Sequence, residues 1–312
     1  MNSYTAALTA EQVEILRAAL EEQCFEFSEK PHALYSGKRG KLNVTVYEKG
    51  PKVLVQGKET EDFVKFTLEP QVLGEARLGY EEVHDPEQFE PHFGIDESGK
   101  GDFFGPLVIA GVYVDKAIAR SLMDAGIMDS KRITSANRIR KLSKIIRETS
   151  GLKWEMVSLG PQRYNEMHAK FRNLNSMLAW GHARVIEKLH TSVPACPRAL
   201  SDQFARPDVL QRALKKQGIE IQLDQRTKGE SDVAVAAASI LARERFVDWM
   251  EKTSAAAGIE MPLGASNAVV DAARKLLDAH GREGLAKVAK MHFRTAKLVM
   301  GDDSGETREK NS

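Results

Sequence analysis

Acidic side chains follow the ends of short apolar segments at separated points of the sequence, and carboxylate oxygens there could bind divalent cations. Asp96 and Glu97 follow HFGI and precede a glycine-rich loop. Because neighbouring residues of a strand point to opposite faces, at least one of the pair must leave the core face. Asp202 ends a second apolar segment, ALS. A turn aspartate beside a surface glutamate is the ordinary interpretation, and a magnesium or manganese site is the functional one.

A third acidic point is KGESD (228–232), which directly precedes the apolar run VAVAAASILARE. Asp232 stands where the N-cap of the predicted helix would be, a role that stabilises a helix by about 1 kcal/mol. Glu230 would then face a metal ion, and Asp232 is the alternative. Separated acidic segment ends are what a two-metal phosphoryl-transfer site requires, with ions about 3.5–4 Å apart. Spacing alone does not show that these carboxylates converge.

The loop Gly99-Lys100-Gly101 follows the first two carboxylates and has a competing interpretation as a nucleotide-phosphate cradle. It lacks the Gly-Lys-Ser/Thr that opens a helix in such cradles, and it continues into the apolar segment PLVIAGVYV. Glycines beside carboxylates instead allow the backbone of a bulky polyanion to approach closely. Lys100 would supply positive charge to a phosphate.

The elements that must position these residues alternate between strands and helices from about residue 92 onward. Strands are predicted at 92–96, 106–114, 152–158, 197–202 and 219–224. Helices are predicted at 135–148, 161–169, 173–191, 233–254, 266–280 and 283–292. The uninterrupted apolar strand at 106–114 is typical of a strand buried on both faces. The alternation predicts an α/β domain with a mixed central sheet flanked by helices.

The preceding residues predict a smaller α+β module with a curved antiparallel sheet. A helix is expected at 10–28 with Thr9 as its N-cap, strands within 41–57, and a helix at 61–73 that Pro70 shortens. Polar, acidic residues at 74–92 indicate a connection between modules. We expect domains at 1–85 and 93–300, a linker at 86–92 and a polar tail at 301–312.

Composition limits the classes of protein that this chain can represent. Of its 312 residues 42% are hydrophobic and 29% charged, which excludes global disorder. Residues 1–90 carry a net charge of −7 and residues 91–312 a net charge of +8, so the second part is better suited to a polyanion. Apolar runs are too short for a membrane span. The absence of a basic, apolar leader and the use of two distant cysteines predict a cytoplasmic protein.

The segment GIDESGKGDFFGPLVIAGVYV (94–114) resembles the first active-site motif of bacterial ribonuclease HIII, a type 2 ribonuclease H. Further segments match that family in order: Asp129-Ser130-Lys131 with a basic helix, Tyr164-Asn165, NLNSMLAWGHA (173–183), SDQFA (201–205), KGESDVAVAAASILARERF (228–246) and KMHF (290–293). NVTVYEKGPKVLVQGKETEDF is similar to the family's TATA-binding-protein-like domain. The resemblance covers about residues 10 to 300.

The resemblance implies an endonuclease that hydrolyses the RNA strand of RNA/DNA hybrids with two Mg²⁺ or Mn²⁺ ions. It leaves 5′-phosphate and 3′-hydroxyl ends. Asp96, Glu97 and Asp202 match three of the family's four catalytic carboxylates. Glu230 takes the fourth place, where the sister branch ribonuclease HII has Lys-Gly-Asp. The following segment is one residue shorter than expected, so Asp232 stays the alternative.

The resemblance also places substrate contacts in both domains. Around the cut, Ser98, Gly99, Lys100 and Gly101 are expected to meet the RNA strand, whose 2′-hydroxyls distinguish it from DNA. Lysine in place of the sister branch's arginine loses a planar fork and favours longer RNA stretches over single ribonucleotides. A junction-type ribonuclease and a non-catalytic hybrid-binding protein are the alternatives.

In the N-terminal domain, Tyr47 and Gln56 are expected to contact the hybrid, with Thr45 beside them. Packing alone also accounts for Tyr and Thr in strands. His292 is expected either to stabilise the leaving group or to cap its helix. His168 and His182 are expected to be core or surface polar residues rather than ligands, because no His/Cys cluster accompanies them. A monomer without an obligate protein partner is expected.

Overall fold

A computed structural model describes residues 3–74, 85–127, 133, 135–226 and 229–301. The chain divides into two compact units, Met1–Glu87 and Gln88–Ser312. The expected motif Asp129-Ser130-Lys131 lies outside the described residues, and so do Lys228 and all of the expected polar tail after residue 301. Within the described residues, no helix is both long enough and apolar enough to cross a bilayer.

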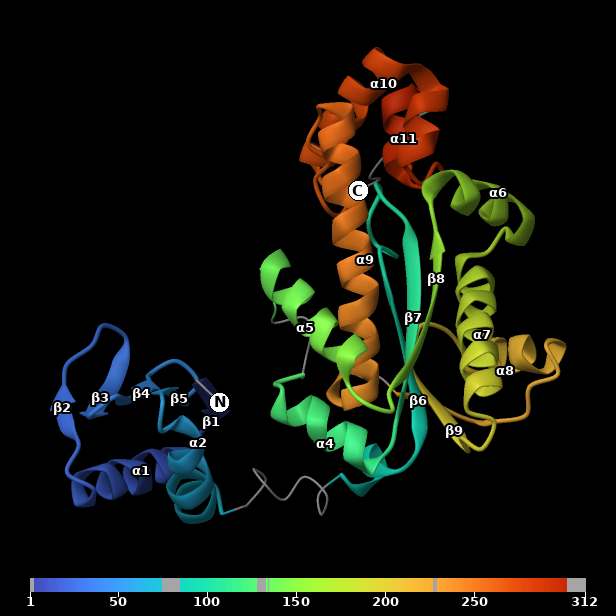
Figure 1. The fold of residues 1–312 in the computed structure, drawn as a ribbon. Helices are drawn as coiled ribbons and strands as arrows, with labels where there is room; N and C mark the ends of the chain where they lie inside the picture. The colour runs from blue at the N-terminus through green and yellow to red at the C-terminus, as the bar shows by residue number, and fades with distance from the viewer. Residues whose placement is uncertain (1–2, 75–84, 128–132, 134, 227–228, 302–312) are drawn as a thin grey trace, which may run out of the picture. The chain divides into compact units, whose positions relative to one another are not determined.

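The first unit is a five-stranded antiparallel sheet with helices packed against one face (Figure 1). Its strands are β1 (Ser3–Ala7), β2 (Glu26–Ser28), β3 (Ala33–Arg39), β4 (Leu42–Tyr47) and β5 (Lys52–Gly57), in the order β1-β5-β4-β3-β2. Its helices are α1 (Ala10–Glu22), α2 (Thr60–Phe63) and η1 (Val64–Leu73). Leu42, Val44 and Val46 of β4 alternate toward the helices and are fully buried.

The first helix begins as predicted and ends earlier than expected. Thr9 and Gln12 form a reciprocal capping box at its start. The expected continuation to residue 28 is wrong, because Cys24 adopts a left-handed backbone with φ of 58°. The amide of Phe25 then bonds the carbonyl of Leu20, which closes the helix and releases the chain into β2. Strands β1 and β3 were not predicted from the sequence, and β2 lies within the range of the expected helix.

The expected helix at 61–73 is present in an unusual form, and Pro70 does not shorten it as expected. After the short α2, η1 is a π-helix that contains Pro70. Proline lacks an amide hydrogen and collides with the carbonyl four residues earlier, and a widened turn relieves that collision. Val64, Leu68 and Val72 of η1 still reach the core of the first unit.

The second unit is built on a mixed five-stranded sheet in the order β10-β9-β6-β7-β8. The strands are β6 (His92–Ser98), β7 (Leu107–Val114), β8 (Lys153–Leu159), β9 (Arg198–Asp202) and β10 (Gln222–Arg226). β7 pairs antiparallel with β6 and β8, whereas β9 pairs parallel with β6 and β10. Ile95 pairs with Ser201, so the register continues to place Asp96 beside Asp202 at the carboxyl ends of two parallel strands.

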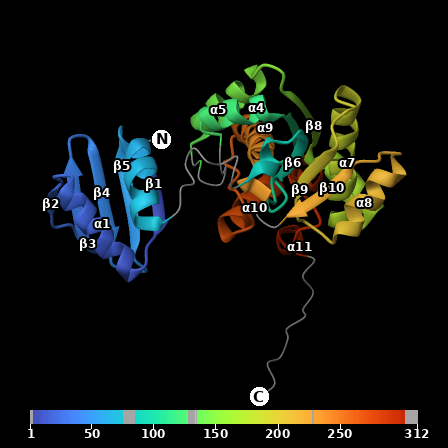
Figure 2. The same cartoon turned by 90° about the horizontal axis from the view of Figure 1, so that it is seen from below.

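Long helices cover both faces of this sheet, as Figures 1 and 2 show. The alanine-rich α9 (Val233–Ala257) packs on one face and α7 (Leu174–Ser192) on the other. Glycines permit the close approach on both sides. A Cβ at Gly94 would lie 2.3 Å from the backbone of Ala234 in α9, and one at Gly181 would lie 2.4 Å from Ile109 of β7. The positions of the candidate site residues on β6 and β9 therefore depend on tight helix–sheet contacts.

The remaining helices of the second unit are partly as expected. They are η2 (Pro86–Phe89), α4 (Lys116–Asp124), α5 (Ala136–Glu148), α6 (Pro161–Phe171), α8 (Pro207–Lys216), η4 (Gly229–Ser231), α10 (Asn267–Val288) and α11 (Arg294–Met300). The sequence did not predict α4, α8 or α11. The two helices expected at 266–280 and 283–292 form the single element α10, which is broken at Gly281 with φ of 66°.

The boundary between the units lies within the expected linker, and its second half is structured. Gln88 and Phe89 are buried in η2, and Phe89 joins the core of the second unit. His92 is fully buried at the start of β6. The linker expected at 86–92 is therefore mostly part of the second unit, because its apolar and imidazole side chains have a core to enter.

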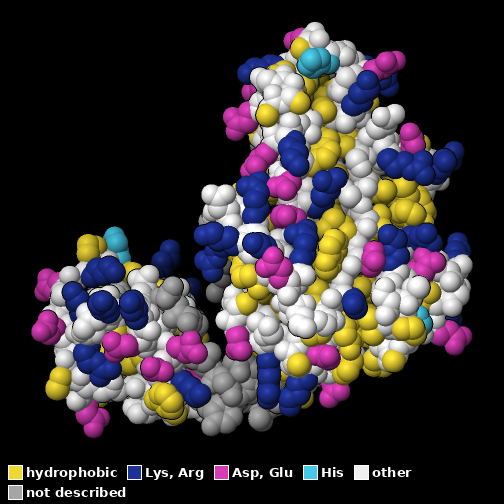
Figure 3. Space-filling view, in the orientation of Figure 1, with side chains coloured by type: hydrophobic (Ala, Val, Ile, Leu, Met, Phe, Trp, Pro, Cys, Tyr) yellow, Lys and Arg dark blue, Asp and Glu magenta, His cyan; other side chains and the backbone are white. Residues whose placement is uncertain are grey.

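The basic helix α5 is partly neutralised by its neighbour α9. Arg140 pairs with Asp248 and Glu251, and Arg147 pairs with Glu244. Figure 3 shows the resulting mixture of Lys, Arg, Asp and Glu side chains over this face. Arg140 and Arg147 are therefore used in pairing α5 with α9.

Candidate active site

The adjacent carboxylates Asp96 and Glu97 are divided between the two faces of β6. Asp96 is bonded by Ser239 of α9, whereas Glu97 is bonded by His182 of α7. The alternation of side chains along a strand accounts for this division. Asp202, which follows Ser201 in β9, shares the α9 face with Asp96.

Asp96 is a crowded carboxyl group. Burial, followed by the negative charge of Glu97, raises the pKa of Asp96 to about 7, and Asp202 adds to the rise. Hydrogen bonds from Ser239 and from the amide of Glu97, at 2.8 Å, oppose it only partly. The position therefore concentrates negative charge that the surrounding side chains do not balance.

Glu97 has the opposite electrostatic character. Burial favours its neutral form, but the contacts with His182 and Lys100 outweigh burial and lower its pKa. His182 Nε2 lies 3.1 Å from one carboxylate oxygen, and Lys100 Nζ lies 3.4 Å from the other. Glu97 is therefore held ionised at neutral pH, in an orientation set by two partners. Lys100, expected to meet a phosphate, is paired with this carboxylate.

Asp202 is joined to the segment that carries the fourth expected carboxylate. Its Oδ1 accepts a hydrogen bond from the amide of Gly229 at 3.1 Å. A Cβ at Gly229 would lie 3.2 Å from the Cα of Asp202, so glycine permits this close approach. The backbone of Glu230 follows in η4, and its side chain lies outside the described part of the structure.

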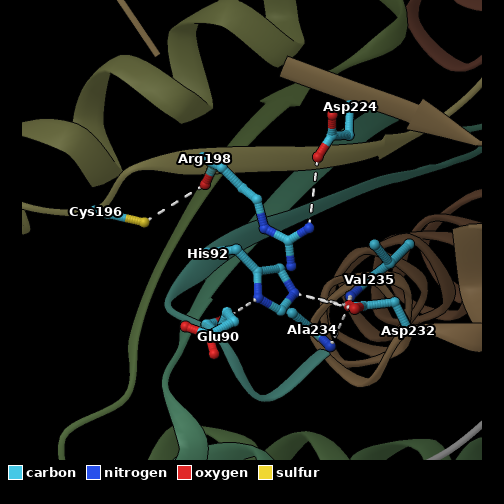
Figure 4. A network of polar contacts seen from close by, with 8 residues as sticks. All are labelled: Glu90, His92, Cys196, Arg198, Asp224, Asp232, Ala234 and Val235. Atoms are coloured by element: carbon cyan, nitrogen blue, oxygen red, sulfur yellow. Dashed lines mark hydrogen bonds and ion pairs between the residues drawn. The ribbon is translucent and has the colours of Figure 1, made fainter. Parts of the chain in front are cut away.

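The carboxylate of Asp232 stabilises the start of α9 and the buried ring of His92 (Figure 4). Asp232 is the N-cap of α9, as predicted, and its Oδ1 accepts hydrogen bonds from the backbone amides of Ala234 and Val235. The buried ring of His92 lies 3.1 Å from its carboxylate, and the other ring nitrogen lies 2.7 Å from the carbonyl of Glu90. His92 precedes Asp96 by four strand residues, or roughly 13 Å. The carboxylate of Asp232 is thus bonded to the start of α9 and to His92.

The glycine-rich loop after β6 is fixed by residues from the far end of the chain. Gly99 has φ of 85°, and a Cβ there would lie 2.1 Å from the carbonyl oxygen of Pro106, so only glycine fits. Gly101 is exposed, and a Cβ there would meet nothing within 4 Å. Ser98, the last residue of β6, is half-buried. Of these residues, Gly101 leaves open space in which a large ligand could approach.

Lys290 anchors this loop from inside. Its side chain is fully buried, and its Nζ donates to the carbonyls of Asp102 at 2.8 Å and Phe104 at 3.3 Å. Burial lowers the pKa of Lys290 to about 7. Asn165 bonds the backbone of the same segment at Ala289 and Met291.

The other two histidines of interest stack on each other. The rings of His168 and His292 are 4.1 Å apart, and Tyr164 continues the stack. Desolvation, then the charges of His168 and Lys290, lowers the pKa of His292 to about 4, so its ring is neutral at neutral pH. Phe293 rather than His292 is the N-cap of α11, which rules out the expected capping role.

In the first unit, the residues expected to contact nucleic acid share one face of the sheet. Thr45 and Tyr47 alternate with the buried valines of β4 and therefore face away from the helices. Gln56 pairs across strands with Asn43, on that same face, and is exposed. Thr45 itself is buried and hydrogen-bonded to Ser36 at 3.0 Å. Tyr47 and Gln56 thus remain the more accessible of the expected contacts.

Comparison with known proteins decides the family. Residues 93–296 match the Ribonuclease HII family. Ribonuclease HIII of Protochlamydia amoebophila is 39% identical over 96% of this chain and 97% of its own length. Ribonuclease HIII of Chlamydia trachomatis is 40% identical over 96% and 98%. This chain belongs to the ribonuclease HIII family.

Solved structures agree with the assignment to ribonuclease HIII. Bst-RNase HIII in complex with Mn²⁺ has a TM-score of 0.67 at 29% identity and covers 97% of this chain and 99% of its own. Ribonuclease HII from Archaeoglobus fulgidus, solved with PCNA, has a TM-score of 0.56 at 25% identity. It covers 67% of this chain and 96% of its own. The chain is accordingly a ribonuclease H, a hydrolase of the endonuclease class.

The structure contains buried polar side chains beside the candidate site that sequence reasoning missed. His182 was expected to be an unremarkable polar residue, yet it contacts Glu97. Lys290 and Asn165 were noted only as parts of motifs. The sequence signal that could have identified His182, Asn165 and Lys290 is a polar residue within an apolar segment, since a buried polar group requires a partner.

Proposed function

We propose that this ribonuclease HIII hydrolyses the RNA strand of RNA/DNA hybrids with two divalent cations, leaving 5′-phosphate and 3′-hydroxyl ends. The observation that supports the proposal most directly is the placement of Asp96 and Asp202. They share one face at the ends of parallel strands, with Glu97 adjacent and the Gly229–Ser231 turn bonded to Asp202. A protein that only bound hybrid would gain nothing from acidic groups facing phosphates.

The residues suit a hard cation, by the chemistry of the donor set. Asp96, Glu97 and Asp202 offer carboxylate oxygens. Burial, and then the charges of Glu97 and Asp202, raise the pKa of Asp96, and a bound cation would offset all three. Among the described residues, no group of three His, Cys, Asp or Glu side chains is close enough together to hold a metal ion as the side chains stand. The proposed fourth ligand is Glu230, and Asp232 is left out because helix capping and His92 occupy it.

The side chains of the chain would have separate tasks. When bound, the two divalent cations would activate the attacking water and stabilise the leaving 3′ oxygen. Asp96 would hold both cations, with Glu97, Asp202 and Glu230 completing their surroundings. Ser98, Lys100 and the backbone of Gly99 and Gly101 would meet the RNA strand near the cut. Lys100 would balance the charge of Glu97 and then of a phosphate.

A cleavage assay on three labelled duplexes tests this function. The substrates are a continuous RNA/DNA hybrid, a DNA duplex with one ribonucleotide, and plain DNA, each with Mg²⁺ or Mn²⁺. Efficient cutting of the hybrid with poor cutting at the single ribonucleotide is expected. Preference for the single ribonucleotide would support the junction-type alternative instead. Hybrid binding without metal-dependent cutting would leave only a binding protein.

Metal binding is expected to release protons below about pH 7. The metal-free carboxyl of Asp96, with a pKa of about 7, is protonated there, and a cation requires its ionised form. Apparent Mn²⁺ affinity should therefore fall up to about tenfold per pH unit below 7 and level off above it. Calorimetry in buffers of different ionisation enthalpy measures the protons released. Affinity that is independent of pH between 5 and 8 would contradict this assignment.

The first unit is proposed to bind the hybrid through the sheet face that carries Tyr47 and Gln56. Removing residues 1–87 should raise KM for hybrid about tenfold or more and change kcat by less than about threefold, since linked binding sites raise affinity without new chemistry. Replacing both residues with alanine in the full chain should act in the same direction. Gln71→Ala, an exposed change on the helical side, is the matched control. A loss confined to kcat would place this unit in the chemistry.

A further inference from the structure

His182 occupies a position that the proposed chemistry does not yet explain. It lies in the middle of α7 with a fully buried side chain. Its neighbour Gly181 brings α7 close to the sheet, because any Cβ there would collide with Ile109. The ring thereby reaches the end of β6. Burying an imidazole costs free energy unless both ring nitrogens find partners.

Both ring nitrogens of His182 have such partners. Nε2 faces Glu97 Oε2 at 3.1 Å, and because a carboxylate only accepts, Nε2 carries the hydrogen and donates. Nδ1 lies 3.1 Å from Ser201 Oγ, a hydroxyl that can donate or accept. Ser201 is fully buried in β9, next to Asp202. The serine therefore fixes the ring that in turn fixes the glutamate.

The remaining surroundings restrict the same carboxylate. The ring of Phe204 packs on His182 with centroids 4.6 Å apart, and Lys100 Nζ lies 5.8 Å from the centre of that ring. Lys100 also contacts the second oxygen of Glu97. The side chain of Lys100, however, is long, flexible and 37% exposed, whereas that of His182 is fully buried. The direction of Glu97 thus depends chiefly on the histidine.

We propose that His182, oriented by Ser201, is a positioning residue that holds Glu97 on the α7 side of β6 in the geometry needed to bind a divalent cation. The proposal rests on the proposed function, in which Glu97 is a metal ligand. Hydrogen-bonded partners of ligating carboxylates typically contribute 10- to 100-fold in metal affinity or activity. The same size of effect is expected here.

The test compares His182→Leu, which removes the donor, with His182→Gln, whose amide can place a donor near the position of Nε2. His182→Leu should lower kcat on hybrid and weaken Mn²⁺ binding, each about 10- to 100-fold, with KM for hybrid unchanged. His182→Gln should recover most of both losses. Mn²⁺ binding is measured without substrate by electron paramagnetic resonance. His190→Gln, on the same helix outside this cluster, is the matched control.

A double-mutant comparison separates positioning from general damage to the core. In a Glu97→Gln background, His182→Leu should cause no further loss in kcat or Mn²⁺ affinity, because its partner is already changed. A further loss of equal size would overturn the proposal, and so would unchanged Mn²⁺ affinity in His182→Leu. If His182→Leu does not fold, Ser201→Ala replaces it. Ser201→Ala should lower kcat and Mn²⁺ affinity by a smaller factor, and unchanged values of both would overturn the proposal.

The same set of variants distinguishes this proposal from the proposed function. An inactive Glu97→Gln beside a fully active His182→Leu would overturn only the role of His182. A fully active Glu97→Gln with normal Mn²⁺ affinity would overturn the assignment of Glu97 as a ligand, and the positioning role with it.

Discussion

Replacing Asp96 with Asn is expected to abolish cleavage and, at the same time, to stabilise the metal-free protein. The change removes a carboxylate from the proposed cation site, so kcat should fall by about a thousandfold or more. It also removes a buried charge whose pKa is raised to about 7 by burial and by Glu97. Above pH 7 Asp96 is ionised in the folded protein at a free-energy cost that the unfolded chain does not bear. Asn removes that cost, so the free energy of unfolding of the variant should rise by on the order of 1 kcal/mol.

Thermal unfolding without metal at pH 8, with hybrid cleavage and hybrid binding in parallel, measures both effects of Asp96→Asn. Binding of the hybrid should be largely retained. Asp278→Asn, an exposed position on α10, makes the same change in charge away from the site and should alter neither quantity. Retained cleavage in Asp96→Asn would mean that the cation site has been placed wrongly. A loss of stability would mean that the hydrogen bonds of Asp96 outweigh its crowding.

Glu230 and Asp232 are expected to respond to substitution in opposite ways. Glu230→Gln should reduce kcat by about a hundredfold or more without changing the unfolding free energy, because a proposed metal ligand is lost. Asp232→Ala should lower the free energy of unfolding by about 2–3 kcal/mol, because it removes the N-cap of α9 and leaves one ring nitrogen of buried His92 without its carboxylate partner. Asp232→Asn retains a capping oxygen and should keep cleavage within a few-fold.

Cleavage at low temperature, where every variant is folded, and denaturant unfolding separate these two residues. Ser231→Ala, between them, controls for disturbance of the η4 turn. Equal, mild losses of kcat in Glu230→Gln and Asp232→Asn would remove the basis for choosing Glu230. A stable, inactive Asp232→Asn would restore Asp232 as the fourth carboxylate.

Local patterns predicted the elements that carry the site. The apolar run at 106–114 became the interior strand β7, buried as expected, because its burial on both faces leaves a continuous signal. The capping positions of Thr9 and Asp232 were readable because a cap depends on residues within one turn. Family resemblance, rather than spacing, identified Asp202 as a partner of Asp96.

Long-range packing accounts for what the sequence did not predict. His182 and Glu97 are 85 residues apart, and Lys290 is 188 residues from Asp102, so no local pattern connects them. The end of α1 at Glu22 depends on the left-handed conformation of Cys24, for which glycine is the usual signal. Short elements such as α11 have too few turns to show a period.

The dependence of the glycine-rich loop on Lys290 has a consequence for synthesis of the chain. Strand β6 and its carboxylates are synthesised first, but the loop after them is bonded at Phe103 and Gly105 to backbone groups at residues 264, 288 and 290. At 5–20 residues per second, roughly 10 to 40 seconds separate these events. A nascent chain therefore carries its acidic residues long before it can assemble the loop, and it should gain cutting activity only after residues 264, 288 and 290 have been synthesised.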